Sequence, residues 1–151
     1  MSPLLCALMA LLLPAQAEKT IQLRLQQEYG RAVFRDCRLD IGVYEAAGRA
    51  SMRCLRNHPQ ATELLRGRAL AGEEVARLRD LVRESKLMTG GYIGTDTTAS
   101  DGVFETLKVL DGTATAGVLV TSGNPSFVTG PRRQLLDWLR ALLSELQKSA
   151  R

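Results

Sequence analysis

Two cysteines, Cys37 and Cys54, constrain this chain more than any other feature of its sequence. Apolar and polar residues alternate on both sides of Glu45-Ala46, which is the pattern of a β-hairpin with a two-residue turn. A turn at these residues fixes the pairing of the two arms and sets Cys37 directly opposite Cys54. Directly opposed strand residues bring their Cβ atoms close to the separation that a disulfide needs. The sequence therefore predicts a Cys37–Cys54 disulfide across a hairpin.

The same pairing accounts for the other apolar residues of the hairpin. It sets Leu39 against Met52 and Ile41 against Ala50, on the face that carries the two cysteines. The residues between them are mainly Arg, Asp and Ser, and they belong to the other face. The apolar pattern and the register of the hairpin thus agree.

The first residues predict that the chain is exported. Residues 4–13 are an unbroken apolar run, followed by a proline and a small-x-small triplet at 15–17, as in a secretory signal peptide. The run is too short to cross a bilayer, although no Lys or Arg precedes it. We expect cleavage after Ala17, a secreted or periplasmic protein, and a single domain over residues 18–151. Export favours an oxidised pair of cysteines over the alternative, two reduced thiols buried as small apolar side chains.

Periodicity in the remaining sequence predicts an α+β fold. Apolar residues at helical spacing predict one helix that starts near Gly72 and ends at the glycine pair 90–91, and a second that starts at Pro131. Asp111-Gly112 is a hairpin turn signal. Besides the cysteine hairpin, four segments alternate like strands: 21–26, 62–70, 103–110 and 116–121. The expected architecture is an antiparallel sheet of about five or six strands with two amphipathic helices packed on one face.

The sequence shows no catalytic signature. Its single histidine, His58, lies in an Asn-His-Pro turn. The sequence therefore does not support a nucleophilic triad, which would have to be built around this one histidine, and it lacks the several nitrogen or sulfur ligands of a zinc site. The formal net charge is +4, and no run of like charge resembles a nucleic-acid-binding arm. No second apolar stretch could serve as a transmembrane anchor after removal of the leader. We therefore expect no enzymatic activity, no metal, no cofactor and no nucleic-acid partner.

Two long segments between predicted elements are candidates for partner binding. Residues 88–102 and 122–130 are rich in small and polar residues, and long loops in small domains often carry function. The first lacks the Walker spacing that cradles phosphate and has few carboxylates for calcium, so a plain connecting loop is the alternative. The two aromatic and apolar side chains Ile93 and Phe127 could equally fold back onto the core. The candidate contact residues are Tyr92, Ile93, Asp96, Asn124 and Phe127.

Arginines gather on the polar face of the predicted hairpin. Arg38 and Arg53 oppose each other directly, and Arg49 belongs to the same face. Like charges in this arrangement are mildly destabilising unless neighbouring acids relieve them. A basic patch at Arg38, Arg49 and Arg53 could bind an anionic glycan, a lipid headgroup or an acidic protein. An ordinary solvated, arginine-rich surface is the alternative.

From Glu73 onward the sequence resembles emfourin-type proteins, small bacterial inhibitors of thermolysin-like metalloproteases. The resemblance lies in the helix EEVARLRDLV, the strand FETLKVLDG with its return strand, and the closing helix LLDWLRALL, roughly the last half of the chain without its leader. The matching positions are core positions: Leu78, Leu81, Leu107, Val109, Leu135 and Leu139. The resemblance implies a fold and a protease-inhibitor function, but no inhibitory residue carries over. The chain departs from the family in its cysteine-linked hairpin and in both long loops.

The sequence as a whole predicts an exported binding module whose partner is another protein. In the leading interpretation it inhibits a metalloprotease through segments 89–101 and 122–130. The alternative is an envelope-associated protein that binds anionic polymers through its arginine-rich sheet face. An enzyme that uses loop carboxylates is the least favoured of the three.

Overall fold

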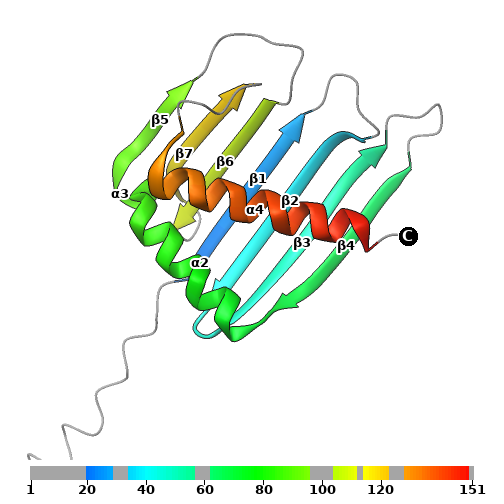
Figure 1. Cartoon of the computed structure of the whole chain (residues 1–151), viewed down its shortest axis with the longest axis horizontal. Coiled ribbons are helices and arrows are strands. Elements are labelled where there is room, and N and C mark those ends of the chain that lie inside the picture. The colour runs from blue at the N-terminus through cyan, green and yellow to red at the C-terminus, as the bar shows by residue number, and fades with distance from the viewer. Residues whose placement is uncertain are drawn as a thin grey trace, which may run out of the picture.

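The computed structural model describes residues 20–28, 34–56, 62–95, 104–111, 114–122 and 128–149. In this part of the chain seven strands form one sheet, in the order β4-β3-β2-β1-β6-β7-β5 (Figure 1). The strands are β1 (Ile21–Glu28), β2 (Phe34–Tyr44), β3 (Ala47–Arg56), β4 (Glu63–Leu70), β5 (Gly91–Thr95), β6 (Phe104–Asp111) and β7 (Ala114–Ser122). The helices are α2 (Gly72–Ser85), α3 (Leu87–Gly90) and α4 (Gly130–Lys148). The expected leader lies outside the described residues.

The cysteine hairpin has the predicted register. Cys37 pairs with Cys54 across β2 and β3, and the turn is at Glu45 and Ala46. Glu45 has a positive φ of 52°, as the first residue of a tight hairpin turn often does. A disulfide joins the two cysteines, which confirms the pairing that the sequence predicts.

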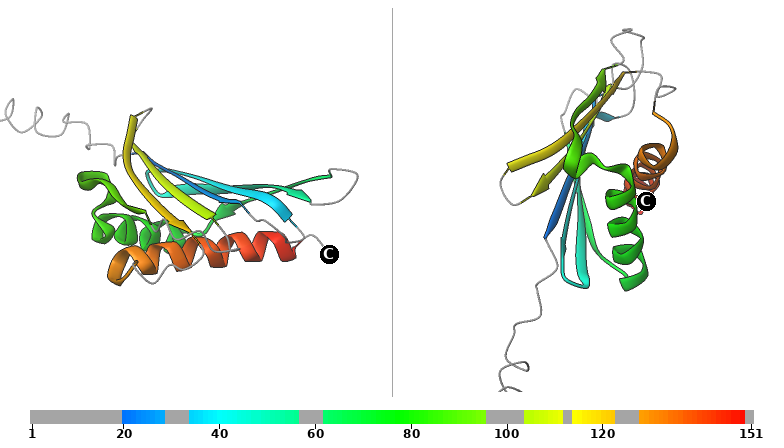
Figure 2. Two further views of the ribbon diagram at one scale, coloured as in Figure 1. Left: turned by 90° about the horizontal axis from the view of Figure 1, so that it is seen from above. Right: turned by 90° about the vertical axis from the view of Figure 1, so that its left-hand side faces the viewer.

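Two long helices cover one face of the sheet and form the core with it. Figure 2 shows α2 and α4 on the same side, with neither on the other face. Each helix buries one apolar stripe because its leucines recur at helical spacing. The largest fully buried side chains come from both layers: Leu25, Leu39, Val43, Met52, Leu78, Leu81, Leu87, Leu107, Leu135, Leu136, Leu139 and Leu143. These findings confirm the α+β class, the antiparallel arrangement of six strands and the position of both helices.

The segment after α2 differs from the sequence-based expectation. The helix ends at Ser85 rather than at residues 90–91, because Lys86 takes a left-handed conformation with φ of 56°. The short helix α3 follows, and β5 then pairs in parallel with β7 at the edge of the sheet. Residues 88–95 are therefore not a loop, and β5 is a seventh strand that alternation did not reveal. The predicted β6–β7 hairpin is present, but Asp111 belongs to β6 and pairs with Ala114.

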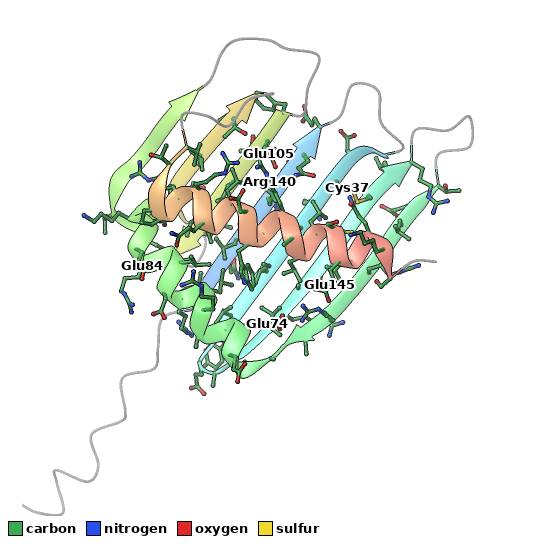
Figure 3. The ribbon with its side chains drawn as sticks, viewed as in Figure 1. Cys37, Glu74, Glu84, Glu105, Arg140 and Glu145 are labelled. Carbon is green, nitrogen blue, oxygen red and sulfur yellow. A yellow bond between two sulfur atoms is a disulfide. The ribbon has the colours of Figure 1, made fainter. Side chains whose placement is uncertain are left out.

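Arg68 of β4 ties the start of α2 to the end of α4. Its guanidinium donates two hydrogen bonds to Glu74, at 2.7 and 2.8 Å, and two to Glu145, both at 3.1 Å. Glu74 also accepts the backbone N–H of Ala71 and so satisfies one unpaired donor at the helix start. The hydrogen bond from Arg68 holds the pKa of Glu74 below its usual value, although partial burial acts in the opposite direction. Figure 3 shows Glu74 on α2 and Glu145 on α4.

No helix in the described part of the chain is long and apolar enough to cross a membrane.

The disulfide is expected to contribute substantially to stability. Cys37 is 1% and Cys54 0% exposed, and Gln147 of α4 donates a hydrogen bond to the Cys37 sulfur at 3.2 Å. Replacing both cysteines with alanine is expected to lower the free energy of unfolding by about 2–5 kcal/mol, because the unfolded chain loses a cross-link. Urea denaturation measures this change. Stability equal to that of the parent protein would show that the disulfide is dispensable.

Gly117 of β7 is expected to reject any side chain. A Cβ at this position would overlap the backbone carbonyl of Leu87 in α3, whereas a Cβ at Gly42 would meet nothing within 4 Å. Gly117→Ala should therefore lower the free energy of unfolding by about 3 kcal/mol, because the backbone of α3 must move away from the sheet. Gly42→Ala, the matched control, should change it by less than about 0.5 kcal/mol. Equal denaturation curves for the two variants would contradict the close approach of α3.

Candidate functional site

Most chain connections of the sheet meet at one end. Glu28 pairs with Phe104, and Phe104 pairs with Ser122, so β1 and β7 finish where β6 begins. β5 runs parallel to β7 and finishes on the same side at Thr95. We call this end of the sheet, marked by Glu28, Thr95, Phe104 and Ser122, the loop end. The chain leaves the sheet here, at Thr95 and Ser122, within the two predicted binding segments 89–101 and 122–130 (Figure 1).

The predicted contact residues fall in two groups. Tyr92 and Ile93 lie in β5, and their Cα partners in β7 are Val118 and Leu119. β5 is the last strand of the sheet on this side, so one of its backbone edges has no strand partner among the described residues. The positions of the Tyr92 and Ile93 side chains, and all of Asp96, Asn124 and Phe127, lie outside what the structure describes. Their contact roles stay predictions.

A buried polar cluster lies below the loop end, on the helix-covered face. Glu105 of β6 is only 3% exposed and accepts hydrogen bonds from Gln27 Nε2 at 2.6 Å and Arg140 Nε at 3.0 Å. A second guanidinium nitrogen of Arg140 also pairs with it, and Thr121 Oγ1 lies 3.4 Å from its other oxygen. Figure 3 shows Arg140 of α4 reaching toward Glu105. A buried carboxylate needs this degree of hydrogen bonding, and the cluster therefore fixes α4 on β1, β6 and β7.

The sequence analysis did not identify this cluster, although one signal for it was present. Glu105 shares its side of the strand with Leu107 and Val109, which are both core residues. An acid in line with two core positions must be paired or neutral when it is buried. The partner Arg140 comes from another element, 35 residues away, and alternation in one strand cannot reveal it.

The predicted arginine face is present and is largely neutralised by acids. Its side of the sheet, opposite the helices, is called the open face from here on. Arg38 and Arg53 oppose each other as predicted. Asp40 pairs with both Arg24, at 2.6 Å, and Arg38, at 2.8 Å, while Arg53 pairs with Glu63 on β4. Acids in the same face therefore relieve the repulsion that the sequence predicts.

Arg49 differs from these arginines. It is exposed, and no carboxylate pairs with it among the residues that the structure describes. It lies beside Gly42, where the open face lacks a side chain. Two shallow hollows of about 300 Å³ each adjoin at these two residues. The hollow toward the middle of the sheet is lined by Gln22, Arg24, Asp40, Gly42, Arg49, Ser51 and Leu110, together with backbone neighbours.

The described ranges hold no group of three or more His, Cys, Asp or Glu side chains placed to bind a metal ion. No protein-family model and no curated protein matches this chain. The resemblance of the C-terminal half to emfourin-type proteins accordingly stays a prediction. Function is inferred below from the residues and their placement.

Glu105 is expected to be essential for stability, in contrast to a neighbouring acid. Glu105→Gln removes the buried charge opposite Arg140 and should lower the free energy of unfolding by about 3 kcal/mol. Asp137 also pairs with Arg140, at 3.5 Å, but its side chain is half exposed. Asp137→Asn should therefore cost less than about 1 kcal/mol. Chemical denaturation of both variants checks this, and similar costs would mean that burial of Glu105 does not decide the effect.

Proposed function

We propose that this chain is an exported binding module that inhibits a metalloprotease through segments 89–101 and 122–130. The observation that supports it most directly is β5, which contains Tyr92 and Ile93 and forms an edge of the described sheet. An edge strand has backbone N–H and C=O groups that no neighbouring strand uses. Extended segments of this kind are recognised by proteins through added backbone hydrogen bonds. A protease cleft that accepts an extended chain is a partner of the right shape.

The strand order supports a joint action of the two segments. β7 lies between β5 and β6, so Thr95 at the end of β5 and Phe104 at the start of β6 lie on either side of β7. The distance between them is two strand spacings, about 10 Å. The chain leaves β7 for α4 at the same place, after Ser122. Thr95 and Ser122, one residue from each candidate segment, therefore lie at the same end of the sheet, above the Glu105 cluster that holds strands and helix together.

The alternative function, binding of anionic polymers through Arg38, Arg49 and Arg53, has less support. Asp40 and Glu63 already pair with two of these three arginines. A polyanion would have to displace those acids or be repelled by them.

Shortening either segment is expected to weaken inhibition. The purified protein should inhibit a thermolysin-like metalloprotease, and deletion of residues 97–100 or of residues 124–126 should raise the inhibition constant at least tenfold, equal to about 1.4 kcal/mol. The reason is that each deletion removes contacts next to β5 or β7. Steady-state cleavage of a fluorogenic peptide measures the inhibition constant.

A third deletion, of residues 58–60, is the matched control. It shortens the connection between β3 and β4, which belongs to the same end of the sheet but to its opposite side. This variant should inhibit like the parent protein. No inhibition across a panel of metalloproteases and serine proteases would remove the proposal, and equal loss in all three deletions would show that the chosen segments have no special role.

A further inference from the structure

We propose that Arg66 and Arg68, called the edge arginines from here on, block pairing of β4 with β4 of a second copy of this chain. This inference concerns the edge of the sheet farthest from β5 and does not rest on the inhibitor function. Three observations carry it: the direction of the β4 backbone groups, the hydrogen bonds that the edge arginines donate to them, and the ion pairs that hold Arg68 in place.

β4 has one backbone edge without a strand partner among the described residues. It is the last strand of the described sheet on the side away from β5 (Figure 1). The backbone N–H of Arg56 donates to the carbonyl of Thr62, and β3 and β4 pair in the register that continues from this bond. Because hydrogen-bonded and non-hydrogen-bonded pairs alternate in an antiparallel ladder, the even-numbered residues of β4 bond to β3. The backbone groups of the odd-numbered residues therefore point outward, away from β3: Glu63, Leu65, Gly67 and Ala69.

An edge of this kind suits a second copy of the same strand. With a two-fold axis at Leu65, an antiparallel pair of β4 strands places Leu65 opposite itself and Glu63 opposite Gly67 of the other copy. All three residues have outward backbone groups, so each of these pairs could exchange both of its hydrogen bonds. The Leu65 side chain is 59% exposed and would pack against its own copy. The two Arg68 residues, which α4 contacts through Glu145, would lie about 20 Å apart along the strands, so this alignment keeps the two α4 helices apart.

The edge arginines occupy carbonyls that such pairing needs. A guanidinium nitrogen of Arg66 donates a hydrogen bond to the Leu65 carbonyl at 2.9 Å, and one of Arg68 donates to the Ala69 carbonyl at 3.1 Å. Both carbonyls belong to residues whose backbone groups point outward. A second strand would have to displace these donors before its own N–H groups could bind. Charged side chains at an edge oppose the addition of a strand in this way.

Arg66 opposes the alignment around Leu65. That alignment needs the Leu65 carbonyl, to which Arg66 donates. It would also make the two copies of Arg66 diagonal neighbours across the pair of strands, where like charges repel each other. Both effects end when Arg66 is replaced by an uncharged residue.

Arg68 opposes the alignment around Gly67. In that alignment the other copy would need the Ala69 carbonyl, to which Arg68 donates. Arg68 is held at this place, because its guanidinium donates two hydrogen bonds to Glu74 and two to Glu145. Replacing Arg68 would remove these ties between β4 and the two helices as well. The test therefore leaves Arg68 unchanged and opens only the alignment around Leu65.

Replacement of Arg66 tests this inference. In sedimentation-velocity measurements at concentrations on the order of 10–500 µM, the parent protein should be monomeric, whereas Arg66→Thr should form dimers with a dissociation constant at least about tenfold lower. The reason is that the Leu65 carbonyl becomes free to accept from a second copy. Arg49→Thr is the matched control, because it removes the same charge from β3, which has a neighbouring strand on both sides. This control should behave like the parent protein.

Two further measurements locate the contact on β4. In Arg66→Thr, hydrogen exchange of the Leu65 and Gly67 amides should slow at least about tenfold between the lowest and the highest concentration, since these amides bond to the second copy. Adding Leu65→Pro to Arg66→Thr removes an outward N–H but no bond to β3, and it should return the protein to the monomer. The exchange measurement decides by itself if the proline variant does not fold.

Four results would overturn the proposal. They are a parent protein that dimerises as tightly as Arg66→Thr, no self-association of Arg66→Thr in this concentration range, equal association of the Arg49→Thr control, and association of Arg66→Thr without slower exchange at Leu65 and Gly67. The last result would place the contact on a surface other than the β4 edge.

Discussion

The rest of this structure depends on burial of one face of a single sheet beneath two helices. Strand alternation supplies one apolar face, and α2 and α4 each supply an apolar stripe that covers it. In the described residues no second layer covers the opposite face (Figure 2). This asymmetry decides where charges lie: Glu105 is buried and needs several donors, whereas Asp40 and Glu63 pair with arginines along a hydrated surface.

Polar contacts fix α4 to three different parts of the sheet. Arg140 pairs with Glu105 on β6, Glu145 with Arg68 on β4, and Gln147 with the disulfide between β2 and β3. Leucine packing alone tolerates small rotations and shifts of a helix, because apolar contacts have little directionality. The three polar contacts do have a preferred geometry, so together they define where α4 lies. A helix held in this way keeps the loop end in a constant relation to the core.

The sequence predicted local features well and non-local ones poorly. The register of the cysteine hairpin followed from a single turn, and both long helices followed from leucine spacing and from Pro131. β5 was missed because it has only five residues and pairs in parallel with a strand that follows much later in the chain. The neutralisation of Arg24 by Asp40 depends on β1 lying beside β2, which no turn signal specified. The hollow beside Gly42 was not predicted, because locating it requires the order of the strands and the knowledge that Gly42 faces away from the helices.

The disulfide has a consequence for the order of events during folding. It closes a loop of one hairpin, with a sequence separation of 17, so the two sulfurs can meet as soon as the hairpin forms, without any residue of α4. Once α4 packs, Gln147 and the surrounding core shield the sulfurs from oxidants. Thiols that reach the finished fold unpaired would be inaccessible to oxidising enzymes. Burial of both sulfurs therefore makes their oxidation easier before α4 packs on the hairpin than after.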